Sequence, residues 1–195
     1  MTSDFLGYLN DIAPLSTECK AYLQTEARVK TIHKGDYLLR EGEICNKLGF
    51  LQYGCLKSSI MDGDKEKVVW FWTTGDISTS TKSFFEQTPS KNFIRALEDT
   101  QFLYLTHETL QYVYIKYPES NFVARLILEK YYVREVERAE LLQSQTAIDK
   151  YQYLIANHPD LLNIVPDKDI ASYIGISPYR LSHLRSQLRS RKPKT

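Results

Sequence analysis

The C-terminal stretch DIASYIGISPYRLSHLRSQLRSRKPKT (Asp169 to Thr195) combines regularly spaced small and apolar residues with a strongly basic end. Gly175 follows Ala171 by four residues, and Leu181 follows Gly175 by six. A helix-turn-helix needs a small residue where its helices cross, a residue that tolerates positive φ at the turn, and apolar side chains that hold the helices together. The remaining apolar positions are Ile170, Ile174, Ile176 and Leu184. This spacing predicts a helix-turn-helix, with a plain basic helical hairpin as the alternative.

The start of the second helix is marked by Ser177 and Pro178, because a serine hydroxyl caps a free backbone N–H and proline suits the first helical position. At about 100° per residue, one side of this helix is apolar. That side carries Leu181, Leu184 and Leu188, and the opposite side carries Tyr179, Ser182, His183 and Ser186. We expect the leucine side to be buried and the opposite side to be exposed.

These directions predict two kinds of contact with double-stranded DNA. Exposed residues near the start of a recognition helix meet base edges in the major groove, and cations meet phosphates. The predicted phosphate contacts come from Arg180, Arg185, Arg189 and the RKPK end. Together with Ser177, Pro178, Tyr179, Ser182 and His183, these arginines form the candidate DNA-binding set.

The distribution of charge supports this interpretation. The net charge is only +1, from 25 basic and 24 acidic residues. Residues 177–195 hold six of the basic residues and no acidic one, so residues 1–176 carry 19 basic and 24 acidic residues, a charge of −5. A basic end on an acidic body is typical of proteins that bind polyanions, although many basic termini only aid solubility.

Residues 29–106 predict strands separated by turns. Short β-branched and aromatic runs alternate with glycine-centred turns, which favours a closed or rolled β structure. The turn glycines are Gly35, Gly42, Gly63 and Gly75. The preceding segment, Phe5 to about Ala27, is expected to be helical and to pack outside.

A long helix is predicted from Glu119 to about Ser144, because this segment lacks glycine and proline and follows Pro118. Its heptad-like apolar positions, interrupted by Glu129, are Phe122, Leu126, Val133 and Val136. Such a stripe either docks on the β region or pairs with a second copy of the chain, and we favour a parallel dimer seam. A compact helical region follows from Thr146.

Several classes of protein are poorly supported by the sequence. The longest apolar run is VVWFW, and the N-terminus does not resemble a secretion signal, so we expect a cytoplasmic protein with no membrane partner. Three cysteines without a C-x-x-C pair do not favour a disulfide framework or a metal site. Four scattered histidines and the absence of a nucleophile elbow, a P-loop or H-E-x-x-H argue against an enzyme.

With these features in order, the chain resembles the Crp/Fnr superfamily of bacterial transcription regulators. The resemblance rests on GDYLLREGE…LGFLQYGCLKSSIMDGDKEKVVWFWTTGD, on IRALED and on VPDKDIASYIGISPYRLSHLRSQL, and it covers nearly the whole chain. It implies an α+β fold with an N-terminal double-stranded β-helix (β-roll), a long dimerisation helix and a C-terminal winged helix-turn-helix. The expected domains are an effector-binding β-roll (1–118), a dimerisation helix (119–145) and a DNA-binding domain (146–195).

The resemblance also implies function. The family positions that match Pro178, Tyr179 and His183 are its main base readers. The implied protein is a homodimer that recognises an inverted-repeat operator. The implied partners are double-stranded DNA, a second copy of the chain, RNA polymerase and a small-molecule effector.

The effector region departs from the family pattern. Members that bind cyclic nucleotides carry a Gly-Glu and an Arg-Ser pair, where this chain has Gly75-Asp76 and Ser90-Lys91. Lysine cannot reproduce the bidentate fork of arginine on a cyclic phosphate. The position that contacts the adenine falls near Glu135. The candidate effector site is therefore Gly75, Asp76, Ser90, Lys91 and Glu135, and we do not expect a cyclic nucleotide to be its ligand.

Another effector is an open alternative. The segment STSTKSFF (Ser78 to Phe85), with Trp70 and Trp72 on the preceding strand, is a candidate lining for a pocket, although tryptophans on a β-roll are usually core residues. The alternative to a DNA-binding regulator is a ligand-sensing β-roll protein whose DNA binding is weak or vestigial.

Overall fold

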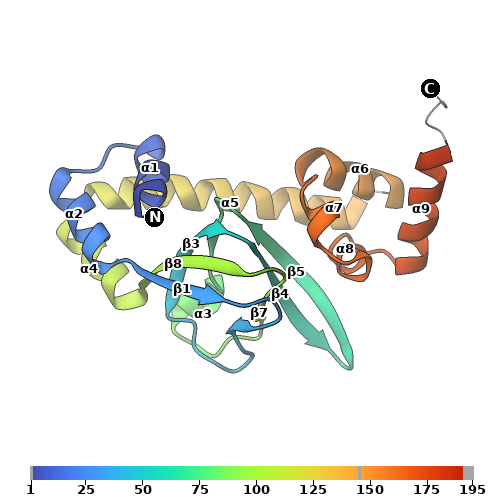
Figure 1. The fold of residues 1–195 in the computed structure, drawn as a ribbon, viewed down its shortest axis with the longest axis horizontal. Helices are drawn as coiled ribbons and strands as arrows, with labels where there is room; N and C mark the ends of the chain where they lie inside the picture. The colour runs from blue at the N-terminus through green and yellow to red at the C-terminus, as the bar shows by residue number, and fades with distance from the viewer. Residues whose placement is uncertain (1, 145, 191–195) are drawn as a thin grey trace.

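Two antiparallel four-stranded sheets form the N-terminal body of the protein (Figure 1). The computed structural model describes residues 2–144 and 146–190. One sheet has the strand order β1-β8-β3-β6 and the other β2-β7-β4-β5, which is the predicted β-roll. The strands are β1 (Arg28–Ile32), β2 (Tyr37–Leu39), β3 (Lys47–Tyr53), β4 (Cys55–Asp62), β5 (Lys65–Thr73), β6 (Ile77–Ser78), β7 (Phe93–Ala96) and β8 (Thr100–Thr106).

The hairpin β4–β5 extends beyond the rest of its sheet, toward the C-terminal helices (Figure 1). Its ladder runs from Cys55 opposite Thr73 to Asp62 opposite Lys65, with a register shift at Ser58/Ser59. The two sheets enclose an apolar core, and its side chains are almost completely removed from water. Core residues include Leu51, Leu56, Phe84, Ile94, Phe102 and Leu103.

The N-terminal segment forms two helices, α1 (Thr2–Ile12) and α2 (Thr17–Glu26), rather than a continuous one. The sequence between them contains Pro14, which cannot donate a helical hydrogen bond. Ser16 then caps α2, because its Oγ accepts from the backbone N of Cys19 at 3.2 Å. Together with α4 (His107–Lys116), these helices cover one end of the roll (Figure 1). A short helix, α3 (Thr81–Glu86), follows β6.

The long helix α5 (Glu119–Ser144) has the predicted bounds and runs along the roll to the C-terminal helices (Figure 1). Val123 and Leu141 on one side are buried. Of the predicted dimer residues, Phe122, Val133 and Val136 are exposed, whereas Leu126 is partly buried against the core. The exposed apolar stripe of α5 also includes Leu128 and Tyr132.

The C-terminal region is helical. Its elements are α6 (Ala147–Asn157), α7 (Leu161–Ile164), α8 (Asp167–Tyr173) and α9 (Pro178–Ser190). No strand follows β8 within residues 2–144 and 146–190, so the strands of the expected wing are not found in that part of the chain. The wing was inferred from the family resemblance, without a strand pattern in this sequence. None of the described helices is both long and apolar enough to cross a bilayer.

Candidate functional site

The turn between α8 and α9 has the geometry of a helix-turn-helix. Gly175 adopts φ +68°, a conformation that costs other L-residues about 1–2 kcal/mol. The backbone N of Ile176 donates to the carbonyl of Ala171 at 2.9 Å, and the N of Gly175 donates to the carbonyl of Ser172 at 3.2 Å. This pair of bonds is a Schellman motif, which ends α8 and redirects the chain.

The start of α9 is capped as predicted. Ser177 Oγ accepts from the backbone N of Arg180 at 3.1 Å, and Pro178 is the first helical residue. The hydroxyl therefore replaces a hydrogen-bond partner that the first turn of a helix lacks.

The two sides of α9 differ in burial in the expected direction. Leu181 and Leu184 are 0% and 2% exposed, and Leu188 is partly buried. Burial of each leucine contributes about 1.5–3 kcal/mol, which fixes the rotation of the helix. Tyr179 is 82% exposed, and His183 is also exposed. Ser177, Pro178, Arg180 and Ser182 are exposed as well.

Arg185 is held inside the helical region. Its Nε donates to the hydroxyl of Tyr151 at 3.0 Å, and its Nη1 forms an ion pair with Asp167 Oδ1. The side chain thereby joins α9 to α6 and to the start of α8, which leaves less of its charge free for a phosphate. Arg189 lies in α9, but its side chain is outside the described residues, as are Lys192 and Lys194.

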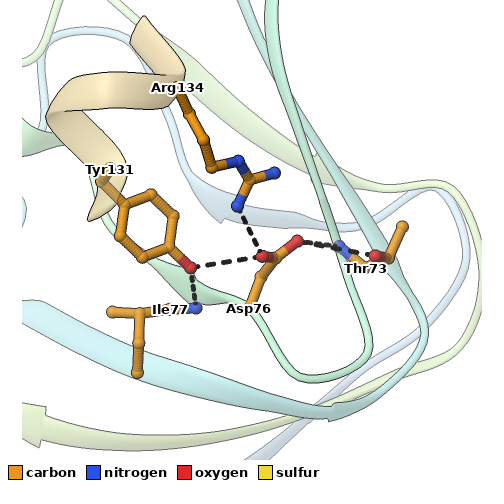
Figure 2. A network of polar contacts seen from close by, with 5 residues as sticks. All are labelled: Thr73, Asp76, Ile77, Tyr131 and Arg134. Atoms are coloured by element: carbon orange, nitrogen blue, oxygen red, sulfur yellow. Dashed lines mark hydrogen bonds and ion pairs between the residues drawn. The ribbon is translucent and has the colours of Figure 1, made fainter. Parts of the chain in front are cut away.

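Asp76, a predicted effector residue, is held by α5 instead (Figure 2). Its Oδ1 accepts from Arg134 Nη1 at 2.8 Å and from the Tyr131 hydroxyl at 3.2 Å. Its Oδ2 accepts from the backbone N of Thr73 at 3.0 Å. The Tyr131 oxygen accepts in turn from the backbone N of Ile77 at 2.6 Å. Burial and the Asp76 carboxylate raise the pKa of Tyr131, so its hydroxyl remains a donor at neutral pH.

The other predicted effector residues are not brought together around Asp76. Gly75 occupies the preceding turn at φ +89°. Ser90 is buried, where its hydroxyl contacts Ser80 Oγ at 2.9 Å and accepts from the backbone N of Asn92 at 3.1 Å. Lys91 is exposed. Ser90 and Asp76 therefore form hydrogen bonds with different partners.

A cavity of about 830 Å³ lies between the β-roll and α5. Glu135 is the only one of the five predicted effector residues among its lining residues. Trp70 and Trp72 line it while being 5% and 7% exposed, so they serve both the core and the cavity wall. Other lining residues, which the sequence did not single out, are Leu128, Tyr131 and Tyr132 of α5 and Asn92 of the roll. The lining is mainly aromatic and aliphatic, with hydroxyls from Thr79, Ser80 and Thr81.

The three cysteines are free and buried. Burial raises the pKa of Cys19 to about 11 and that of Cys55 to about 12, so both thiols are protonated at neutral pH. Within the described part of the chain, no group of three histidine, cysteine or acidic side chains is arranged to hold a metal ion. These thiols behave as small apolar core residues.

Comparison with known proteins agrees with this architecture. Residues 29–117 match the cyclic nucleotide-binding domain family. No curated protein sequence matches the chain significantly. Among solved structures, FixK2 from Bradyrhizobium japonicum aligns with a TM-score of 0.71 and 16% identity over 84% of this chain and 85% of its own.

Two further solved structures are similar. A CooA variant from Carboxydothermus hydrogenoformans aligns with a TM-score of 0.69 and 19% identity, over 87% of this chain and 79% of its own. The c-di-GMP responsive global regulator CLP from Xanthomonas campestris aligns with a TM-score of 0.69 and 14% identity, over 90% of this chain and 92% of its own.

The similarity to these three structures extends over the β-roll, the long helix and the C-terminal helices, because it covers 84–90% of this chain. The chain therefore shares the fold of these three structures, and the match to the cyclic nucleotide-binding domain family covers the segment from β1 to the end of α4.

Proposed function

We propose that the protein is a transcription regulator that binds DNA as a homodimer, with α9 as the recognition helix. The observation that carries the proposal is the orientation of α9. Its leucine side is buried, while Tyr179 and His183 are exposed at the N-terminal half of the helix. This is the arrangement in which a recognition helix reads base edges in the major groove.

The basic residues of this region are the proposed phosphate contacts. Within the described residues, the side chains of Tyr179, Arg180 and His183 have no hydrogen-bond or ion-pair partner. Arg180 is therefore available to a phosphate, whereas Arg185 orients α9 through Asp167 and Tyr151. The proposed contacts of Arg189 and the RKPK end concern side chains outside the described residues.

Substitutions in α9 test this proposal. Tyr179→Ala and His183→Ala should reduce discrimination between cognate and mismatched sites by about 1–3 kcal/mol for each lost base contact. Arg180→Ala should weaken binding to all sequences and lower the slope of log K against log[salt] by about 1. Fluorescence anisotropy with labelled duplexes measures both quantities.

A matched control is available at the opposite end of the molecule. Tyr112 of α4 is also an exposed tyrosine, at 47%. Tyr112→Ala should leave affinity, discrimination and salt slope unchanged. Equal discrimination by the wild type, Tyr179→Ala and His183→Ala would show that α9 does not read sequence.

Homodimerisation is supported by the exposed apolar stripe of α5. The residues of this stripe are all exposed, and two of them, Leu128 and Tyr132, also line the cavity beside the roll: the stripe is Phe122, Leu128, Tyr132, Val133 and Val136. A parallel α5–α5 seam would bury it and relate two α9 helices by a two-fold axis. RNA polymerase is a further proposed partner, from the family resemblance alone.

Ligand sensing by the β-roll is the second candidate function, and the cavity of about 830 Å³ favours it. Its apolar and aromatic lining suits a ligand with large apolar area. We do not expect cyclic AMP to bind, because the carboxylate of Asp76 already accepts from Arg134 and no arginine stands at Ser90-Lys91. Calorimetric titration with cyclic AMP should give no binding heat, and a thermal-shift screen of metabolites tests the cavity.

A further inference from the structure

A fully buried lysine connects the β-roll to the helix-turn-helix. Lys57, on β4, is 0% exposed. Its Nζ lies 2.7 Å from Glu66 Oε1, on β5 of the same hairpin, and 2.8 Å from Asp169 Oδ2, on α8. Asp169 is itself 5% exposed and lies 112 residues away along the chain. The cation therefore has one partner within the roll and one in the helical region.

An ion pair in this position contributes more to geometry than to net stability. Desolvation of two charges offsets most of their attraction, whereas removal of one partner leaves an uncompensated charge in a buried site. Glu66 is well satisfied, because Ser59 Oγ donates to its Oε1 at 2.7 Å. Burial opposes its ionisation, yet the hydrogen bonds from Lys57 and Ser59 hold the pKa of Glu66 below its usual value. The Lys57–Asp169 ion pair therefore favours the arrangement in which α8 is packed against the β-roll.

Neighbouring contacts join the same two surfaces. The backbone N of Val68, on β5, donates to Ser172 Oγ of α8 at 2.9 Å. The ring of Tyr173 packs edge-on against Phe71, with centroids 5.1 Å apart. From α5, Arg138 Nη2 donates to the carbonyls of Val68 and Tyr173 at 3.4 and 3.3 Å. The β-roll and α5 therefore both hold α8.

The position of α8 determines that of α9. The two helices are joined through the Schellman turn at Gly175, and the buried leucines of α9 pack in the same helical cluster. The packing of α8 against the β-roll does not cover the exposed side of α9, since Tyr179 remains 82% exposed. The docked arrangement is consequently compatible with DNA binding.

We propose that Lys57 is a positioning residue for the recognition helix: through Asp169 it fixes α8 and α9 on the β-roll, and in the dimer it thereby fixes the spacing between the two recognition helices. This inference rests on the proposed DNA-binding function. Lys57 lies in the β-roll and is not a proposed base contact. The proposal nevertheless gives it control over the half-site spacing that the protein accepts. It also gives the roll a direct path to α9 that does not pass through the end of α5.

Asp169→Asn tests the proposal, with Glu66→Gln as its matched control. Both substitutions remove one carboxylate charge from Lys57, but only Asp169→Asn weakens the connection to α8, and Lys57–Glu66 remains within the roll. Binding is measured on an inverted repeat of cognate spacing and on one lengthened by about 5 bp, a half-turn that turns the half-sites to opposite faces of the duplex.

The wild type and Glu66→Gln should strongly prefer the cognate spacing. Asp169→Asn should lose about tenfold of this preference, because loss of the carboxylate on α8 removes the charge attraction that holds α8 to the buried Lys57. Binding to an isolated half-site should be unchanged in both variants. An unchanged spacing preference in Asp169→Asn, or an equal loss in Glu66→Gln, would overturn the proposal.

Hydrogen–deuterium exchange gives a readout that does not need DNA. Backbone amides of α8 (Asp167–Tyr173) should exchange faster in Asp169→Asn than in the wild type and Glu66→Gln. If the wild type selects no sequence, the DNA-binding function and the spacing role both fail, while exchange still decides whether Lys57 holds α8. Should Asp169→Asn not fold, Lys57→Met removes the cation itself, and a spacing preference unchanged by this variant would also contradict the proposal.

Discussion

At the scale of single residues, the burial of each side chain in α9 follows its angular position around the helix axis. Tyr179 and Leu181 are two positions apart, yet the first is 82% exposed and the second is fully buried. Two positions correspond to about 200° around a helix, so neighbours of similar size face opposite directions. A tyrosine that remains on the solvent side is available to a partner.

Gly175→Ala should destabilise the helix-turn-helix by about 1–2 kcal/mol, because an L-residue is strained at positive φ. The new Cβ would also lie 3.1 Å from Leu142 Cδ2, so that side chain must shift. Chemical denaturation measures the change, with Gly7→Ala as a control, since a Cβ at Gly7 meets nothing within 4 Å. Equal stability of Gly175→Ala and the wild type would contradict the assigned turn.

His158, which ends α6, should make stability depend on pH. Burial, with a smaller contribution from Arg134, lowers its pKa below the ordinary value near 6.5. A histidine with a depressed folded pKa contributes stability that is complete above the unfolded pKa and is lost as pH falls. Urea denaturation between pH 7.5 and 5.5 should show a decrease of at most about 1.4 kcal/mol per pH unit from this group. His158→Gln should flatten that decrease, and an identical pH profile would refute this assignment.

At the scale of elements, α5 has two features. It joins the roll through Tyr131 and Arg134, which bind Asp76. The exposed apolar stripe is the second feature, and its Leu128 and Tyr132 also line the cavity beside the roll. No element of the described chain covers the exposed apolar residues of α5. We propose that α5 of a second copy of the chain covers them.

Val133→Glu should shift the protein toward the monomer. The substitution places like charges in the proposed seam and removes an apolar contact worth about 1.5–3 kcal/mol, so the dimer dissociation constant should rise at least about tenfold. Sedimentation equilibrium measures this. Ile115→Glu is the control, because Ile115 of α4 is 83% exposed and lies outside the stripe. A dimer that is equally stable in both variants would exclude this seam.

Local signals in the sequence predicted much of the fold. The bounds of α5 followed from the absence of glycine and proline, and the start of α9 followed from Ser177 and Pro178. The leucine side of α9 followed from helical periodicity. Each of these features depends on residues within a few positions of one another, so a single sequence carries the information.

The polar contacts of the candidate sites could not be predicted in the same way. Arg185 bonds Tyr151 across 34 positions, Arg134 bonds Asp76 across 58, and Lys57 bonds Asp169 across 112. The sequence shows that each residue can be charged or polar, but its neighbours in space depend on the tertiary fold. The predictions of Arg185 as a phosphate contact and of Asp76 as an effector residue were therefore made without knowledge of these intramolecular partners, and both stay predictions.

At the scale of the whole molecule, the distribution of charge and the position of α9 both favour binding of a polyanion at the C-terminal end. Residues 177–195 carry six basic residues and no acidic one, whereas the rest of the chain carries a charge of −5. Figure 1 shows that α9 lies at one end of the elongated molecule, away from the β-roll. An acidic body with a basic end should orient the approach of a polyanion toward α9.

Selection of bound duplexes from a random DNA pool by the wild-type protein is the most direct measurement of the central claim, that the exposed side of α9 reads sequence. We predict recovery of an inverted repeat whose half-site centres lie about 10–10.5 bp apart. Repetition with His183→Ala should give relaxed preference at one or two positions of each half-site. A wild-type pool that remains random after selection would contradict the claim.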